Sequence, residues 1–214
     1  MPEDQSVWHR NVLPDGWARA VNELAARSVL EEFYLAGGTG LALQFGHRRS
    51  VDLDLFRERE FDPGELRARL AGLSGLRVRQ ILRGKLHLEY HNILVSFLQY
   101  PYPLLFPPRP FDALTVADLR DIACMKVEAI ASRGSRRDFV DLYVAAHTYG
   151  LREILAWFDQ KYAATPYNRV HLFKALTYFA DAEQQPMPHL LVSLAWETIT
   201  QFFLTEVPRL QRSL

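Results

Sequence analysis

A glycine turn followed by two acids on a strand constrains this chain more than any other feature. The apolar run 33–36 predicts a buried strand that ends at Gly37 and Gly38. Residues 39–46 then predict a short helix that starts directly at the turn. Residues 51–56 (VDLDLF) alternate apolar and acidic side chains with a period of two, which predicts a second strand.

This order of elements favours a phosphate and metal site. Glycines at Gly37 and Gly38 let the backbone approach a ligand, and the start of the following helix offers free N–H groups. Thr39 adds a hydroxyl. Asp52 and Asp54 are two residues apart on a strand, so both point to one face, where paired carboxylates suit Mg²⁺. Taken singly, each feature also fits an ordinary turn or a half-exposed strand.

The rest of the N-terminal half predicts an α/β (α+β) fold with a mixed sheet. Helical spacing covers 15–32, with Asp15 as the N-cap, and a second helix is expected over 62–73. Residues 76–100 alternate through two predicted strands, and a turn at 91–92 would join them as a hairpin.

Regular structure is interrupted at residues 100–110, which hold five prolines. We therefore expect an α/β core over 1–110 and a helical domain over 111–214. The helices of the second half are expected at 115–133, 135–149, 151–162, 166–181 and 190–205.

Composition excludes several classes of protein. The formal net charge is zero, which argues against a general polyanion binder but not against a local basic groove. Cys124 is the single cysteine, so no intrachain disulfide can form. The N-terminus is polar, and no uncharged apolar run approaches the roughly 18 residues of a membrane span. We expect a cytoplasmic protein with no membrane partner.

The segment GGTGLALQFGHRRSVDLDLF resembles the core motif of nucleotidyltransferases. Its sequence pattern, GGT-x-L-A-L and then R-x-S-x-D-x-D, is similar to that of the AbiEii/AbiGii-type toxin family. The YPYP stretch and a later K…R-x-x-x-R-D-x-x-D pattern extend the resemblance over residues 33–143. It implies a nucleotidyltransferase fold and transfer of NMP from an NTP, with Mg²⁺ or Mn²⁺, to a hydroxyl of tRNA, another RNA or a protein. It also implies a toxin of a toxin–antitoxin or phage-defence system, with a cognate antitoxin as partner.

Basic and hydroxyl side chains around the motif are candidates for nucleotide binding. Arg48 and Arg49 flank the acidic strand, and a guanidinium matches phosphate oxygens, although an exposed basic loop explains them equally well. The resemblance adds Ser50 to this group, beside Gly37, Gly38 and Thr39.

Two further candidates lie in the predicted helical half. Lys126 falls on the apolar face of its helix, where spacing alone fits either a buried lysine with an anionic partner or a lysine at the edge of that face. The resemblance favours a nucleotide-binding lysine. Asp138 follows Ser135 by three residues, which fits a capping box, whereas the resemblance favours a catalytic acid.

The sequence departs from the nucleotidyltransferase pattern at one place. The third carboxylate of such sites is expected on the strand 93–97, and the matching position is Ser96. If the hairpin has the predicted register, His87 lies opposite Ser96 and Glu89 lies diagonal to it. Both are therefore candidates for the third metal ligand. A solvent-facing row of polar residues is the simpler explanation. Two alternatives stay open: a degenerate binding protein, and a phosphotransferase that moves the γ-phosphate.

Overall fold

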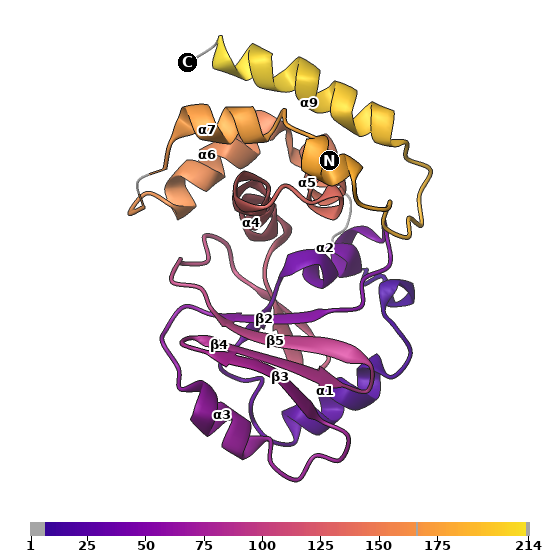
Figure 1. Ribbon diagram of the computed structural model, residues 1–214, viewed down its shortest axis with the longest axis vertical. Helices are drawn as coiled ribbons and strands as arrows, with labels where there is room; N and C mark the ends of the chain where they lie inside the picture. The colour runs from indigo at the N-terminus through magenta and orange to yellow at the C-terminus, as the bar shows by residue number, and fades with distance from the viewer. Residues whose placement is uncertain (1–6, 166, 213–214) are drawn as a thin grey trace. The chain divides into compact units, whose positions relative to one another are not determined.

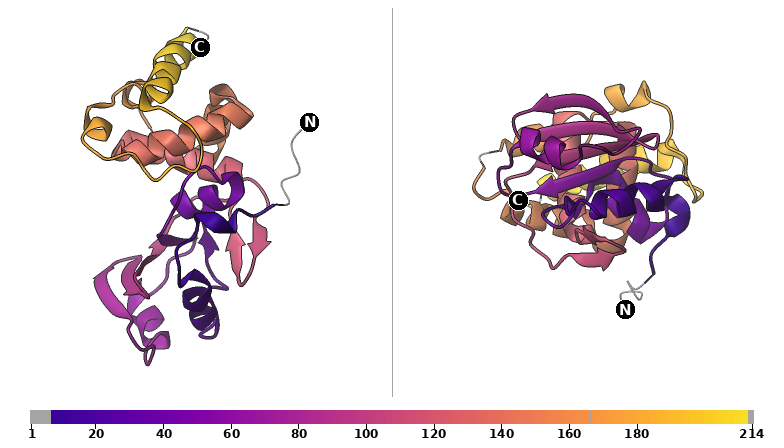
Figure 2. Two further views of the ribbon diagram at one scale, coloured as in Figure 1. Left: turned by 90° about the vertical axis from the view of Figure 1, so that its right-hand side faces the viewer. Right: turned by 90° about the horizontal axis from the view of Figure 1, so that it is seen from below.

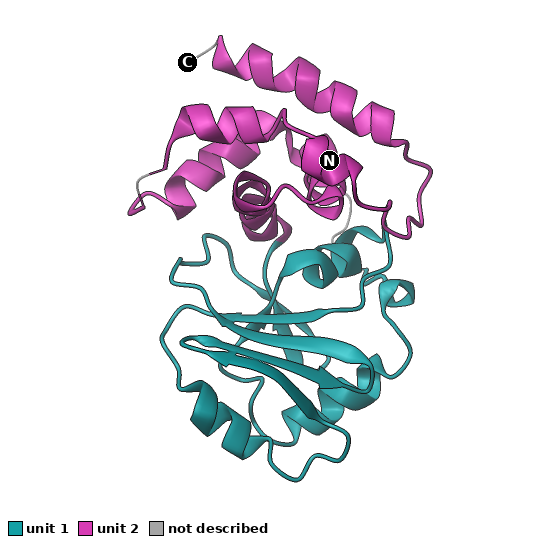
Figure 3. Cartoon of the chain, viewed as in Figure 1, with its two compact units in different colours: residues 1–118 teal, residues 119–214 magenta. Residues whose placement is uncertain are grey.

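The protein consists of two compact units, residues 1–118 and 119–214 (Figure 3). The computed structural model describes residues 7–165 and 167–212. Within those ranges, no helix is both long enough and apolar enough to cross a membrane. The sequence places the division at residue 110; the first unit extends to residue 118 because two short strands follow the proline-rich stretch and join its sheet.

The first unit is built on one mixed sheet of seven strands in the order β3-β4-β5-β2-β1-β7-β6 (Figure 1). β1 pairs antiparallel with β2 and parallel with β7, while β2 pairs parallel with β5. This is the mixed α/β sheet that the sequence predicts. The strands are β1 (Tyr34–Leu35), β2 (Leu53–Arg57), β3 (Arg77–Leu82), β4 (Lys85–Tyr90), β5 (Ile93–Gln99), β6 (Arg109–Phe111) and β7 (Leu114–Val116).

One face of this sheet is covered by helices and carries the core. α1 (Trp17–Ala25) and α3 (Pro63–Arg69) lie together on that side in Figure 1 and in the left view of Figure 2. The core joins strand residues such as Leu55 and Phe97 to helix residues such as Leu24. A 3-10 turn (Arg10–Val12) precedes α1, and α2 (Gly37–Phe45) follows β1.

The helix starts in this unit use different caps. Asp62 caps α3 by accepting a hydrogen bond of 2.6 Å from the backbone N–H of Gly64, as its sequence position predicts. The expectation for Asp15 was wrong. The N-cap of α1 is Gly16 in the left-handed conformation, with no side-chain hydrogen bond, so the chain turns into the helix one residue later.

The predicted hairpin at 91–92 is confirmed with its register. His91 and Asn92 both have positive φ, which is the geometry of a two-residue type I′ turn. Tyr90 therefore pairs with Ile93, and His87 lies opposite Ser96. The expectation of two strands over 76–100 was wrong, because a second turn before β4 adds β3. All residues of β3 are exposed, and the turn that separates it from β4 lies at 83–84, where Gly84 has positive φ.

The second unit is built from helices and the loops that join them, in the residues described. α4 packs against α5, α6 and α7, and α5 also contacts α8 and α9. The single helix expected over 166–181 was wrong, since the chain turns between α7 and α8. The helices are α4 (Leu119–Ser132), α5 (Arg136–Tyr149), α6 (Leu151–Lys161), α7 (Arg169–Ala175), α8 (Ala180–Glu183) and α9 (Trp196–Gln211).

Candidate active site

The glycine turn brings the backbone of α2 against the acidic strand. Gly37 has φ +62°, and a Cβ there would lie 3.0 Å from Oδ2 of Asp54. At Gly38 a Cβ would lie 2.3 Å from Nη2 of Arg48. Position 37 therefore favours glycine both for its backbone conformation and for the nearby carboxylate, whereas a side chain at position 38 would displace the flexible end of Arg48. The sequence predicts that the backbone here can approach a ligand; in the structure a carboxylate and a guanidinium lie against the two glycines.

The start of α2 has the geometry of an anion site. The first hydrogen bond back along the helix runs from the N–H of Gly40 to the carbonyl of Ala36 (3.0 Å). The amides that precede Gly40 have no acceptor within the helix, and they form the positive end of its dipole. A phosphate placed there would receive several backbone N–H groups at once.

Hydrogen bonds of Thr39 and Ser50 connect the loop before β2 to this helix start. Their hydroxyls are joined by a hydrogen bond of 2.8 Å, and the Thr39 hydroxyl lies 2.5 Å from the carbonyl oxygen of Asp52, to which it donates. Both side chains are buried. These two hydroxyls therefore hold Asp52 beside the glycine turn, which explains why threonine and serine occur at this spacing.

Asp54, Ser96 and His87 form one row across three strands. Asp54 pairs with Ser96 between β2 and β5, and Ser96 pairs with His87 between β5 and β4. The Nδ1 atom of His87 and the Oγ atom of Ser96 are 3.1 Å apart and share a hydrogen bond. Nucleotidyltransferases are expected to carry a third acid at the position next to Asp54. Here that position is a serine, which is hydrogen-bonded to a histidine.

Glu89 lies on the same face but is engaged elsewhere. Its carboxylate forms an ion pair with Arg79 of β3. Among the described residues, no three His, Cys, Asp or Glu side chains come together as metal ligands. The donor set beside the glycine turn is thus the two carboxylates of Asp52 and Asp54. Such a set fits Mg²⁺, which is commonly held by one or two carboxylates, water and substrate phosphates.

The two arginines of the loop differ in their surroundings. Arg48 is buried, its Nη1 donates to the carbonyl of Arg49 (2.9 Å), and its guanidinium lies against Gly38. Arg49 is exposed. A cation held at the positive end of a helix favours an anion at the same place, so Arg48 is the better placed of the two to contact a phosphate.

Lys126 and Asp138 meet each other inside the helical unit. The Lys126 ammonium lies 2.9 Å from Asp138 and 2.7 Å from Asp141, and both carboxylates are fully buried. Asp138 also accepts hydrogen bonds from Arg133 and from the Ser135 hydroxyl. Burial opposes its ionisation, but Lys126 and Arg133 outweigh that effect and hold the pKa of Asp138 below its usual value.

Sequence reasoning missed part of this buried group. It assigned no role to Asp141 or to Arg133. The available signal was the basic residue five positions before Asp138, since the helix start between them brings the two together. Arg136, close to Asp138 in sequence, donates instead to the carbonyls of Ala182 and Glu183 in α8.

A family model matches residues 19–212 of this chain, with the description "Nucleotidyl transferase AbiEii toxin, Type IV TA system". The chain belongs to the AbiEii family. It is therefore a nucleotidyltransferase-type enzyme of a toxin family that works in toxin–antitoxin systems. Membership rests on nearly the whole chain, so it covers both the glycine turn and the helical unit.

Individual relatives are similar to this chain in sequence or in fold. An uncharacterised protein of Aquifex aeolicus (strain VF5) is 35% identical over 196 residues, which are 88% of this chain and 92% of the relative. The fold resembles MenT4, a nucleotidyltransferase toxin of Mycobacterium tuberculosis H37Rv, with a TM-score of 0.54, 17% identity, and coverage of 90% and 85% of the two chains. It also resembles the antibiotic-resistance factor ANT(2'')-Ia, with a TM-score of 0.50, 16% identity, and coverage of 71% and 96%. These likenesses show the fold.

Proposed function

We propose that this AbiEii-family protein transfers NMP from an NTP to an acceptor hydroxyl of an RNA, such as a tRNA, or of a protein. The observation that carries the proposal is the contact of the glycine turn with Asp54, since one place then offers amides for a phosphate and carboxylates for a cation. Toxicity follows if the modified acceptor is essential, and a cognate antitoxin would then be needed to restrain it.

The phosphates of the NTP would bind at the start of α2. The backbone amides of Gly37, Gly38 and Thr39 face outward from the first helical turn, and Arg48 adds a buried guanidinium beside them. Thr39 and Ser50 act by positioning, because their hydroxyls already hold the loop to Asp52. Arg49 is exposed and is the candidate for a more distant phosphate.

Asp52 and Asp54 would hold the divalent cation, Mg²⁺ or Mn²⁺. When bound, such an ion would neutralise negative charge on the phosphates and stabilise the charge that develops during displacement. Asp52 lies directly before β2 and Asp54 lies within it, so a cation bound between their carboxylates would reduce the repulsion between two negative charges. Glu89 remains a candidate third ligand only if its ion pair with Arg79 opens.

Lys126 and Asp138 are carried over from the resemblance of their motif. We propose a role for Lys126 in nucleotide binding and for Asp138 as an acid that sets the position and charge of that lysine. The ion pair between them supports the second part, because a buried carboxylate at 2.9 Å fixes the ammonium.

Label transfer tests the proposal directly. The protein is incubated with Mg²⁺, total RNA and an NTP that is labelled at either the α- or the γ-phosphate, beside an Asp52→Ala/Asp54→Ala control. We expect α-label on RNA or on protein, and none in the control. Incorporation of γ-label alone would make the protein a phosphotransferase and would contradict nucleotidyl transfer.

Ser96 supports one second candidate function, a nucleotide-binding protein that has lost catalysis. The serine stands next to Asp54, where a third carboxylate is expected. Such a protein would bind an NTP without transferring label from either position. The variant Ser96→Asp would then gain transfer, whereas an enzyme that works with two carboxylates would change little.

A further inference from the structure

The edge of the sheet at β3 is an open surface that the proposed reaction does not use. β3 is the last strand of the sheet and pairs only with β4. All six of its residues are exposed. An edge strand of this kind presents backbone N–H and C=O groups to which another extended segment can bond.

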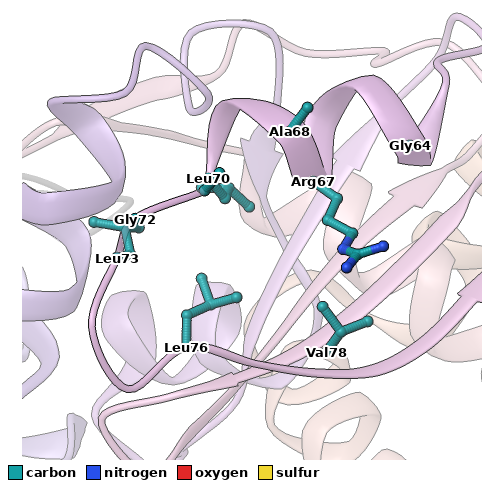
Figure 4. A pocket seen from close by; sticks show the side chains of 9 residues that line it. Gly64, Arg67, Ala68, Leu70, Gly72, Leu73, Leu76 and Val78 are labelled. Carbon is teal, nitrogen blue, oxygen red and sulfur yellow. The ribbon is translucent and has the colours of Figure 1, made fainter.

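A cavity of about 390 Å³ opens beside this strand (Figure 4). Its walls come from α3, from the loop that follows α3, and from the start of β3. Leu70, Leu76 and Val78 surround the space, and Arg67 extends from α3 towards Val78 along its margin. The cavity thus combines an apolar interior with a cation at its rim.

Apolar side chains of β3 lie half-covered next to the cavity. Val78 pairs with Leu88 and Ile81 pairs with Leu86, so both continue the buried face of the sheet. Leu86 and Leu88 are buried, yet Val78 and Ile81 are 39% and 41% exposed because no strand lies beyond them. One further strand would cover both residues and place a side chain over the cavity.

The charge along this edge selects the partner. Arg79 and Arg83 pair with Glu89 and Glu60, and their side chains are still 58% and 88% exposed. Arg67 and Arg77 add two exposed guanidinium groups that form no ion pair within the described part of the chain. The whole chain has zero net charge, so this basic edge is a local feature.

We propose that the β3 edge binds an extended acidic segment of another protein, which adds a strand to the sheet and inserts an apolar side chain into the cavity. Backbone bonds along β3 would give affinity, while the cavity and the arginines would give specificity. A second copy of this chain is disfavoured at the same edge, because it would bring arginines against arginines. The extra residue at the Arg79 bulge likewise interrupts the regular ladder that self-pairing needs.

Selection from a randomised peptide library tests this surface. The intact protein is used as bait, beside an Ala68→Trp variant in which the exposed Ala68 at the cavity wall becomes a bulky ring. We expect the wild-type protein to enrich peptides that alternate acidic and apolar residues, and the variant to lose them. Enrichment of peptides without acidic residues, or equal enrichment by both proteins, would overturn the proposal.

One selected peptide then locates the contact. Hydrogen exchange of the β3 amides should slow when that peptide binds, and Arg77→Glu should weaken binding about tenfold. Lys174→Glu makes the same charge change in the helical unit and should leave binding unaltered. Three outcomes would contradict an acidic strand at this edge. The first is slowed exchange elsewhere with none in β3, and the second is an equal loss of peptide affinity in Arg77→Glu and Lys174→Glu. The third is dimerisation of the protein that Ala68→Trp abolishes.

Discussion

Two groups of carboxylates in this chain are held in opposite ways. Asp52 and Asp54 are half-buried beside the glycine turn of the first unit, Asp52 directly before β2 and Asp54 within it. Asp138 and Asp141 are fully buried in the second unit, where the Lys126 ammonium lies within 3 Å of each. The first pair is still accessible to a ligand, whereas the second pair is enclosed with the lysine that it neutralises.

This contrast separates function from stability. Removing a half-exposed carboxylate from the proposed metal site should reduce ligand binding and catalysis, with little effect on the free energy of unfolding. Removing a buried carboxylate that neutralises a lysine leaves an uncompensated charge inside the protein, which is costly. Variants of the two groups should therefore differ in which property they lose.

The largest effect is expected for Asp54→Asn. Transfer of α-label should fall by roughly a thousandfold, because the carboxylate that would hold the cation is lost. The melting temperature should fall much less than for loss of a fully buried carboxylate, because Asp54 is only half-buried. Glu58→Gln, an exposed acid just after β2, is the control and should alter neither property. A large drop in melting temperature for Asp54→Asn would break the contrast.

The second prediction concerns Asp138→Asn. The free energy of unfolding should fall by about 3 kcal/mol, because Lys126 and Arg133 lose their buried partner. Chemical denaturation measures this loss. Asp159→Asn removes a partly exposed partner of Arg169 and should cost less than about 1 kcal/mol. Equal costs in the two variants would show that the buried group is not a stabilising unit.

The third prediction is a smaller effect of alanine substitution at the glycine turn. It distinguishes loss of stability from backbone strain from loss of nucleotide affinity through contact with Asp54. Gly37→Ala and Gly75→Ala both place a side chain at positive φ, so each should lose about 1–2 kcal/mol of stability. Only Gly37 faces Asp54, at 3.0 Å, while a Cβ at Gly75 meets nothing within 4 Å. Nucleotide affinity should therefore fall in Gly37→Ala alone. A matching loss in Gly75→Ala would attribute the effect to strain rather than to the site.

The sequence predicted the parts of this site that depend on local order. The glycine pair and the alternation over 51–56 predicted the turn and the strand, but the strand begins at Leu53, so Asp54 lies within it and Asp52 just before it. The turn at 91–92 gave the register that brings His87 to Ser96, because a two-residue hairpin leaves one pairing.

Features that depend on contacts distant in sequence stayed hidden. Nothing local tells that Arg79 takes the carboxylate of Glu89, or that Arg133 and Ser135 share Asp138. β3 was not recognised as a separate strand, because the turn at 83–84, where Gly84 has positive φ, lies inside one longer predicted strand. The roles of Lys126 and Asp138 in catalysis rest on motif resemblance and stay predictions.

The smallest expected effect is on stability at acid pH. It tests whether the stabilisation by Asp138 is lost or gained as the pH falls. The pKa of Asp138 is lower in the folded protein than its ordinary 3.8, so its stabilisation is present above that value and is lost as the pH falls. The stability gap between wild type and Asp138→Asn should therefore narrow by about 1 kcal/mol from roughly pH 5 to pH 3. Burial raises the pKa of Asp159, so wild type should gain stability relative to Asp159→Asn over the same range. Chemical denaturation at several pH values measures both gaps, and a gap for Asp138→Asn that widens in acid would mean that this carboxylate is not held ionised by Lys126.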